Sequence, residues 1–133
     1  MIVVDASAVV ELLATEKRNQ RLERRLLEEP DLHAPHLLDV EVANALRGMT
    51  SRGELGGDRA ADALLDVGDM PVELYPHSAL LPRAWELRRS LTIYDAVYVA
   101  LAEALEAPLV TCDAGLARAA ASHVQIELYP RRT

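Results

Sequence analysis

Four acidic residues stand where a folded chain could gather them: Asp5, Glu41, Asp95 and Asp113. Two of them, Asp5 and Asp113, follow short apolar runs that predict strands, and the other two lie in segments that predict helices. Carboxylates without histidine or cysteine partners are the ligands that a hard cation such as Mg²⁺ or Mn²⁺ prefers. If the fold brings the four together, the sequence predicts a metal-dependent enzyme that cleaves phosphodiester bonds.

Each acid also has a simpler interpretation, which the sequence leaves open. Asp5 and Asp113 could cap the helices that follow them, because a carboxylate there accepts backbone N–H groups. Asp95 comes three residues after Thr92, which is the spacing of a capping box. Glu41 could be a solvated residue, although its place at the edge of the apolar stripe of its helix also suits a cleft.

Polar neighbours of these acids could orient them. Ser7 and Thr111 lie two residues from Asp5 and Asp113, and Asn44 shares the helix edge of Glu41. We therefore predict Ser7, Asn44 and Thr111 as residues that hold the carboxylates in place. The tyrosines on either side of Asp95, Tyr94 and Tyr98, have two open interpretations: core packing, or stacking and hydrogen bonding at the site.

Apolar periodicity predicts an alternation of strands and helices along the chain. The predicted strands are 2–4, 32–34, 72–75, 109–111 and 126–128, and the predicted helices are 7–14, 17–29, 36–52, 58–67, 80–91, 94–106 and 114–121. Such alternation is typical of a parallel sheet covered by helices. Ligands of these sheets bind beyond the carboxyl ends of the strands, where Asp5 and Asp113 are expected.

Composition restricts the class of protein. With 133 residues, half of them hydrophobic, the chain is expected to form one domain, 1–133. Phenylalanine is absent, so the core must be built from Leu, Val and Ala, with Trp85 and a few tyrosines. A single cysteine, Cys112, excludes an internal disulfide framework and is expected to be a buried thiol. Neither a membrane-spanning run nor a signal peptide is recognisable, so no membrane association and a cytoplasmic location are expected.

The formal net charge of −7 argues against a protein that holds nucleic acid by bulk electrostatics. It does not exclude a nuclease, because clustered catalytic carboxylates add negative charge that metal ions neutralise. Recognition of a nucleic acid would then depend on a few surface residues, such as Arg47, Arg52 and Arg88.

Four segments, taken in order, resemble the PIN-domain family, and most of all the VapC toxin ribonucleases of bacterial toxin–antitoxin pairs. They are Val-Val-Asp-Ala-Ser-Ala at 3–8, Glu-Val-Ala-Asn at 41–44, Tyr-Asp-Ala-Val-Tyr-Val-Ala-Leu-Ala at 94–102 and Leu-Val-Thr-Cys-Asp at 109–113. Each segment is a weak signal, whereas all four in order are specific. The resemblance extends from Ile2 to about Leu128, and no acidic position is substituted.

The resemblance implies a Rossmann-like α/β/α sandwich with a central parallel sheet of about five strands. It implies that Asp5, Glu41, Asp95 and Asp113 line one pocket for Mg²⁺, with Mn²⁺ as a substitute. Asp5 and Asp95 are expected to be the main ligands, and Glu41 and Asp113 to complete the pocket. Four adjacent carboxylates without metal would repel one another, so at least one should have a raised pKa.

The same resemblance implies an endoribonuclease that cuts single-stranded regions of tRNA or rRNA and thereby stops translation. It also implies a homodimer that is silenced by a VapB-type antitoxin in a toxin–antitoxin hetero-oligomer. A non-catalytic PIN-like module that binds RNA or protein is the alternative. Other α/β classes fit less well, because a phosphorelay receiver needs adjacent acids after the first strand and an aspartyl-phosphate phosphatase needs an acid at Ser7.

Overall fold

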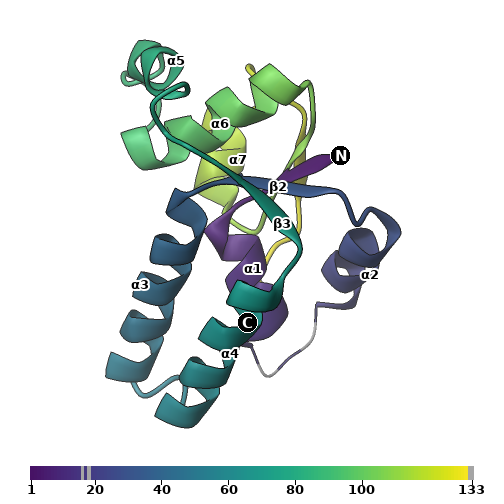
Figure 1. The fold of residues 1–133 in the computed structure, drawn as a ribbon, viewed down its shortest axis with the longest axis vertical. Helices are drawn as coiled ribbons and strands as arrows, with labels where there is room; N and C mark the ends of the chain where they lie inside the picture. Colours follow the sequence, from purple (N-terminus) through teal and green to yellow (C-terminus); the bar gives the residue numbers. More distant parts are fainter. Residues whose placement is uncertain (16, 18, 132–133) are drawn as a thin grey trace.

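The fold is an alternation of five strands and seven helices in a computed structural model that describes residues 1–15, 17 and 19–131 (Figure 1). The strands are β1 Ile2–Val4, β2 Leu32–Pro35, β3 Val72–Tyr75, β4 Leu109–Thr111 and β5 Ile126–Leu128. The helices are α1 Ala6–Leu13, α2 Gln20–Glu28, α3 Leu37–Ser51, α4 Gly57–Asp69, α5 Leu81–Glu86, α6 Ile93–Leu105 and α7 Ala114–Ala120. All five predicted strands are confirmed, and the helices agree except at some of their ends.

The strands form one parallel sheet in the order β3-β2-β1-β4-β5. In Figure 1, helices α1, α3 and α4 lie below the sheet and helices α5, α6 and α7 lie above it. This is the predicted α/β/α sandwich. The chain runs from β1 to β2 toward one edge of the sheet and from β4 to β5 toward the other, so the strand order reverses between β1 and β4. The crevice at such a reversal is where open α/β sheets bind ligands.

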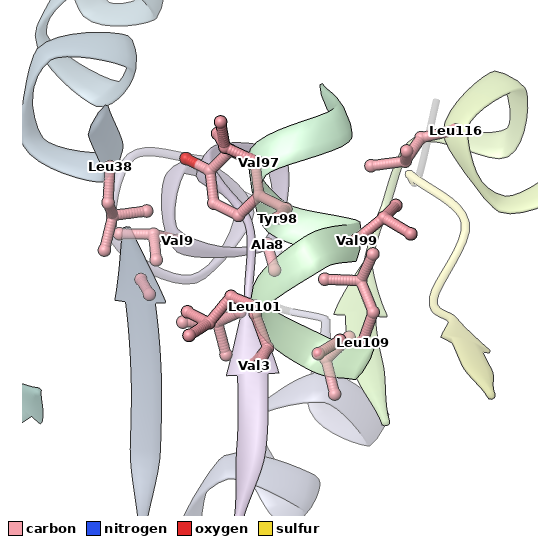
Figure 2. Packing of buried hydrophobic residues seen from close by; sticks show 14 of the residues in the cluster. Val3, Ala8, Val9, Leu38, Val97, Tyr98, Val99, Leu101, Leu109 and Leu116 are labelled. Carbon is pink, nitrogen blue, oxygen red and sulfur yellow. The ribbon is translucent and has the colours of Figure 1, made fainter. Parts of the chain in front are cut away.

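The core surrounds β1 and α6. All three residues of β1 are fully buried, as expected for a central parallel strand covered on both faces. Helix α6 crosses β1, β2 and β4, and every residue from Ala96 to Ala102 is buried. Figure 2 shows Val99 and Leu101 of this helix next to Val3 and Leu109 of the strands. The prediction that this nearly apolar helix is buried is therefore confirmed.

Some predictions of local structure were wrong. Trp85 is not a core residue: 61% of it is exposed, and the Arg88 guanidinium lies 4.5 Å from its ring centroid. Helix α5 ends at Glu86 instead of continuing to residue 91, because the next backbone bonds include three-residue turns such as that from the Arg88 N–H to the Trp85 carbonyl.

Helix α2 begins at Gln20 instead of residue 17. The Asn19 side chain caps it by accepting the Leu22 N–H at 3.1 Å. Part of the predicted helical start, residue 18, lies outside the described residues. Within the described part of the chain, no helix combines the length and apolarity needed to cross a membrane.

Replacing Leu101 by Ala tests the packing of α6. Leu101 is 2% exposed, so Leu101→Ala should lower the free energy of unfolding by about 2–5 kcal/mol through lost burial and a cavity. Leu65→Ala, at a position that is 69% exposed in helix α4, is the matched control and should change it by less than about 0.5 kcal/mol. Urea unfolding measures both, and equal effects would contradict the placement of α6 in the core.

Candidate active site

The Asp5 carboxylate is the most strongly held acid of the site. Asp5 directly follows β1, caps α1 and is only 5% exposed. Its Oδ1 accepts the Ser7 hydroxyl at 2.7 Å and the Ala8 N–H at 3.0 Å, and its Oδ2 accepts the Thr111 hydroxyl at 2.5 Å. The carboxylate therefore joins the end of β1 to the end of β4.

The two hydroxyls are fixed by the groups around them. Each has one hydrogen, which it donates to Asp5, so its oxygen is left to accept. The Ser7 oxygen accepts the Cys112 N–H at 2.9 Å, and the Thr111 oxygen accepts the Asp113 N–H at 3.0 Å. A carboxylate has about four acceptor positions, of which these contacts fill three. The position that remains free belongs to Oδ2 of Asp5.

Asp113 and Asp95 both lie at helix starts. Asp113 is exposed and caps α7, with its Oδ1 accepting the Leu116 N–H at 3.1 Å. Asp95 is half-buried in the first turn of α6, and its N–H donates to the Thr92 hydroxyl at 3.1 Å. The capping interpretations are thus confirmed for Asp5 and Asp113, and Thr92 is the predicted cap of α6. Capping of α7 uses one carboxylate oxygen of Asp113. Capping of α6 uses the backbone N–H of Asp95, so it does not prevent the Asp95 carboxylate from binding a ligand.

Glu41 lies in the second turn of α3, is half-buried, and lines a groove of about 550 Å³ between α1 and α3. Ser7 and Asn44 also line this groove. Asn44 is exposed and makes no hydrogen bond to Glu41 among the described residues, so the predicted orienting contact is not formed. The polar group next to Glu41 is the Tyr98 hydroxyl, a contact that the helical spacing of α3 could not reveal.

Electrostatics link all four acids. Burial is the largest effect and raises the pKa of Asp5, Glu41 and Asp95. The negative charge of Asp113 raises the pKa of Asp5 and Asp95 further, and the charges of Asp95 and Asp5 do the same for Glu41. Hydrogen bonds from Thr111, Ser7 and Ala8 oppose the rise at Asp5. The prediction of a raised pKa is confirmed, with burial contributing more than repulsion.

The donor set suits a hard cation by its chemistry. The four acids offer only oxygen ligands, and among the described residues Asp5 keeps one free acceptor position on Oδ2, while the capping bond of Asp95 uses its backbone N–H. However, in the described part of the chain no three His, Cys, Asp or Glu side chains converge closely enough to hold a metal ion. The arrangement therefore fits a cation bound through one or two carboxylates and otherwise by water, which is common for Mg²⁺.

Other polar residues are accounted for by structural contacts. The buried His33 ring lies between the Tyr75 hydroxyl and the Asp31 carboxylate, at 2.6 and 2.8 Å. Arg83 pairs with Glu103 at 2.8 Å, and burial raises the pKa of the Cys112 thiol to about 12. These residues are not candidates for the site, and Cys112 is the buried thiol that the sequence predicted.

Known proteins share this sequence and fold. The PIN domain family matches residues 2–122. Ribonuclease VapC1 of Mycobacterium tuberculosis (strain ATCC 25618 / H37Rv) is 44% identical over 127 residues, which cover 95% of this chain and 96% of that protein. Ribonuclease VapC9 of the same strain is 42% identical over 131 residues, covering 98% of this chain and all of that protein.

Among solved structures, PAE2754 from Pyrobaculum aerophilum has a TM-score of 0.68 and 26% identity, covering 94% of this chain and 87% of that chain. The fold therefore agrees with those of known structures over nearly the whole length.

Asp95→Asn tests the raised pKa of Asp95. A carboxyl group whose pKa is higher in the folded than in the unfolded protein makes the folded state less stable as pH rises from the unfolded value of about 4 through the folded value. Removing Asp95 should therefore make the variant increasingly more stable than the wild type as the pH rises above about 4, until the difference levels off above the folded pKa of Asp95.

Urea unfolding in EDTA at several pH values measures this difference. Asp39→Asn, which removes an exposed acid from the first turn of α3, controls for the loss of one negative charge. A difference that stays constant with pH, or shifts toward the wild type, would contradict the raised pKa of Asp95.

Proposed function

This chain belongs to the PIN-domain family, and we propose that it is the toxin of a toxin–antitoxin pair, an endoribonuclease that requires Mg²⁺ or Mn²⁺. The observation that carries the proposal is the group of four acids, linked electrostatically in a chain, where the strand order reverses between β1 and β4. Relatives that are more than 40% identical over nearly their whole length are ribonucleases by name. The site's all-oxygen donor set supports phosphodiester hydrolysis.

The acidic residues would have different roles in the reaction. Asp5, through its free Oδ2 position, and Asp95 would hold the metal ion, and Asp113 would complete the pocket from its exposed rim. When bound, the ion would supply charge compensation at the phosphate and a lower pKa for water. Glu41 lines the groove and interacts electrostatically with Asp95 and Asp5, and its raised pKa suits a group that positions water and takes its proton.

Three arginines line the groove and could bind the phosphates of the RNA backbone. Arg47, Arg52 and Arg131 line the same groove as Glu41, in a chain whose net charge is −7. The Arg52 guanidinium passes over Gly48, where an added Cβ would come within 2.9 Å of it, and Glu54 holds it through bonds of 2.8 and 3.1 Å. We propose that these arginines bind phosphates of a single strand on its way to the acids.

The remaining parts of the proposal concern partners and place. We propose tRNA or rRNA as the target, the cytoplasm as the location, and a VapB-type antitoxin that silences the chain by occupying the groove. We propose a homodimer through the apolar side chains that α5 and α6 expose, Leu81, Trp85 and Tyr94. A module that binds RNA without cutting it is the second candidate, and it is favoured by the lack of three converging ligands among the described residues.

Cleavage of total cellular RNA tests catalysis. The purified protein with Mg²⁺ or Mn²⁺ should produce discrete fragments, and EDTA or Asp5→Ala should slow cleavage at least about 100-fold, equivalent to about 3 kcal/mol of transition-state stabilisation. Asp39→Ala, the removal of an exposed acid of α3, is the control and should cut normally. A folded, metal-loaded protein that binds RNA but leaves it intact would support the binding module instead.

Arginine variants test the path of the RNA. In an inactive Asp95→Asn background, Arg47→Ala and Arg52→Ala should each weaken binding of a labelled single-stranded RNA. Each should also reduce the slope of log K against log salt by about 0.7, the value for one phosphate contact of a single strand. The control Arg88→Ala removes a guanidinium stacked on Trp85 outside the groove. Fluorescence anisotropy measures the slopes, and equal slopes for all three variants would contradict the proposed path.

A further inference from the structure

The Tyr98 hydroxyl is a buried polar group without a well-formed partner. Tyr98 is 1% exposed, and its hydroxyl is the one buried side-chain polar atom of the described residues that makes no hydrogen bond within ordinary geometry. Leaving such a group unpaired destabilises the folded state, and native proteins seldom do so. Packing alone does not account for it, because the ring of a phenylalanine would fill the same space without this cost.

The hydroxyl is directed at one acid of the proposed site. Figure 2 shows the Tyr98 oxygen pointing away from its own helix, α6, toward the side of Leu38 in α3. Glu41, one turn further along α3, is close enough that the hydroxyl opposes the burial-driven rise in the pKa of its carboxyl group, and burial together with the negative charge of Glu41 raises the pKa of Tyr98. The hydroxyl therefore interacts with the Glu41 carboxylate without making a regular hydrogen bond to it.

Among the residues that the structure describes, Glu41 lacks the hydrogen bonds that hold two of the acids around it, Asp5 and Asp113. Three donors hold Asp5, and a backbone N–H holds Asp113. Asn44, the neighbour on the Glu41 helix edge, makes no bond to it in the described part of the chain. The Tyr98 hydroxyl is thus the donor within reach that could fix the orientation of the Glu41 carboxylate.

We propose that Tyr98 is a positioning residue of the acidic site: its hydroxyl donates to the Glu41 carboxylate and fixes which oxygen of Glu41 faces Asp5 and Asp95. This inference rests on the proposed function, because it gives Glu41 a role toward the metal ion and water. Tyr98 acts only through Glu41 and touches neither the ion nor the RNA. Groups that orient metal-site carboxylates in this way commonly affect affinity as much as 10- to 100-fold.

Tyr98→Phe separates this role from packing. The variant keeps the ring and removes the poorly paired hydroxyl, so in EDTA its midpoint of thermal unfolding should equal or exceed that of the wild type. Its dissociation constant for Mn²⁺, measured by calorimetry on the full chain, should nevertheless rise about 10-fold. Tyr129→Phe, which removes a hydroxyl that donates to Glu127 at 3.3 Å outside the acidic site, is the matched control and should leave the dissociation constant for Mn²⁺ unchanged.

Glu41→Gln completes a double-mutant cycle. If Tyr98 acts through Glu41, adding Tyr98→Phe to Glu41→Gln should produce no further loss of Mn²⁺ affinity. On RNA, Tyr98→Phe should lower kcat and leave KM nearly unchanged, because it alters the reacting groups and not the groove. Unchanged Mn²⁺ affinity in Tyr98→Phe, or losses that simply add in the double variant, would overturn the inference.

The outcomes also distinguish this inference from the proposed function. A wild-type protein that binds Mn²⁺ in a Tyr98-dependent way but cuts no RNA would support the positioning role and refute the ribonuclease. A protein that cuts RNA while Tyr98→Phe binds Mn²⁺ normally would support the ribonuclease and refute the positioning role. A wild type that binds no Mn²⁺ at all would refute the positioning role as well.

Discussion

The buried carboxylate of Asp5 is the constraint on which the rest of the site depends. An ionised group that is 5% exposed is costly unless it is fully hydrogen-bonded, and here two hydroxyls and one backbone N–H surround it. Those bonds fix the start of α1, the end of β4 and, through the Thr111 oxygen, the backbone that carries Asp113. One network therefore sets the separation of the two central strands at the edge where the acids gather.

The remaining acids reach this point from outside the sheet. Helix α3 brings Glu41 from one layer and the start of α6 brings Asp95 from the other, so the site lies between the two helical layers of the sandwich. Burial and mutual repulsion make this arrangement unfavourable without a counter-charge, and the raised pKa of three acids expresses that cost. Binding sites commonly lower the stability of the free protein, and binding of the ligand restores that stability.

Sequence patterns predicted the secondary structure and the parallel sheet well. The buried β-branched and leucine-rich runs gave all five strands, and the alternation with helices gave a parallel sheet with Asp5 and Asp113 at its carboxyl edge. Contacts between distant elements were harder to predict. Helical spacing places Asn44 beside Glu41, but it cannot show that Tyr98 of α6 approaches the same carboxylate. The exposure of Trp85 was also missed, because composition gives a residue's hydrophobicity and not the layer against which its helix packs.

The central claim is that the acids around Asp5 form a metal site, and anomalous diffraction tests it most directly. Crystals of the protein grown with Mn²⁺, measured at the manganese absorption edge, should give an anomalous peak within coordination distance of Asp5 Oδ2 and beside Asp95, at about 2.0–2.3 Å from the carboxylate oxygen if the bond is direct. Absence of a peak there at saturating Mn²⁺, or a peak only at other surface acids, would contradict the account.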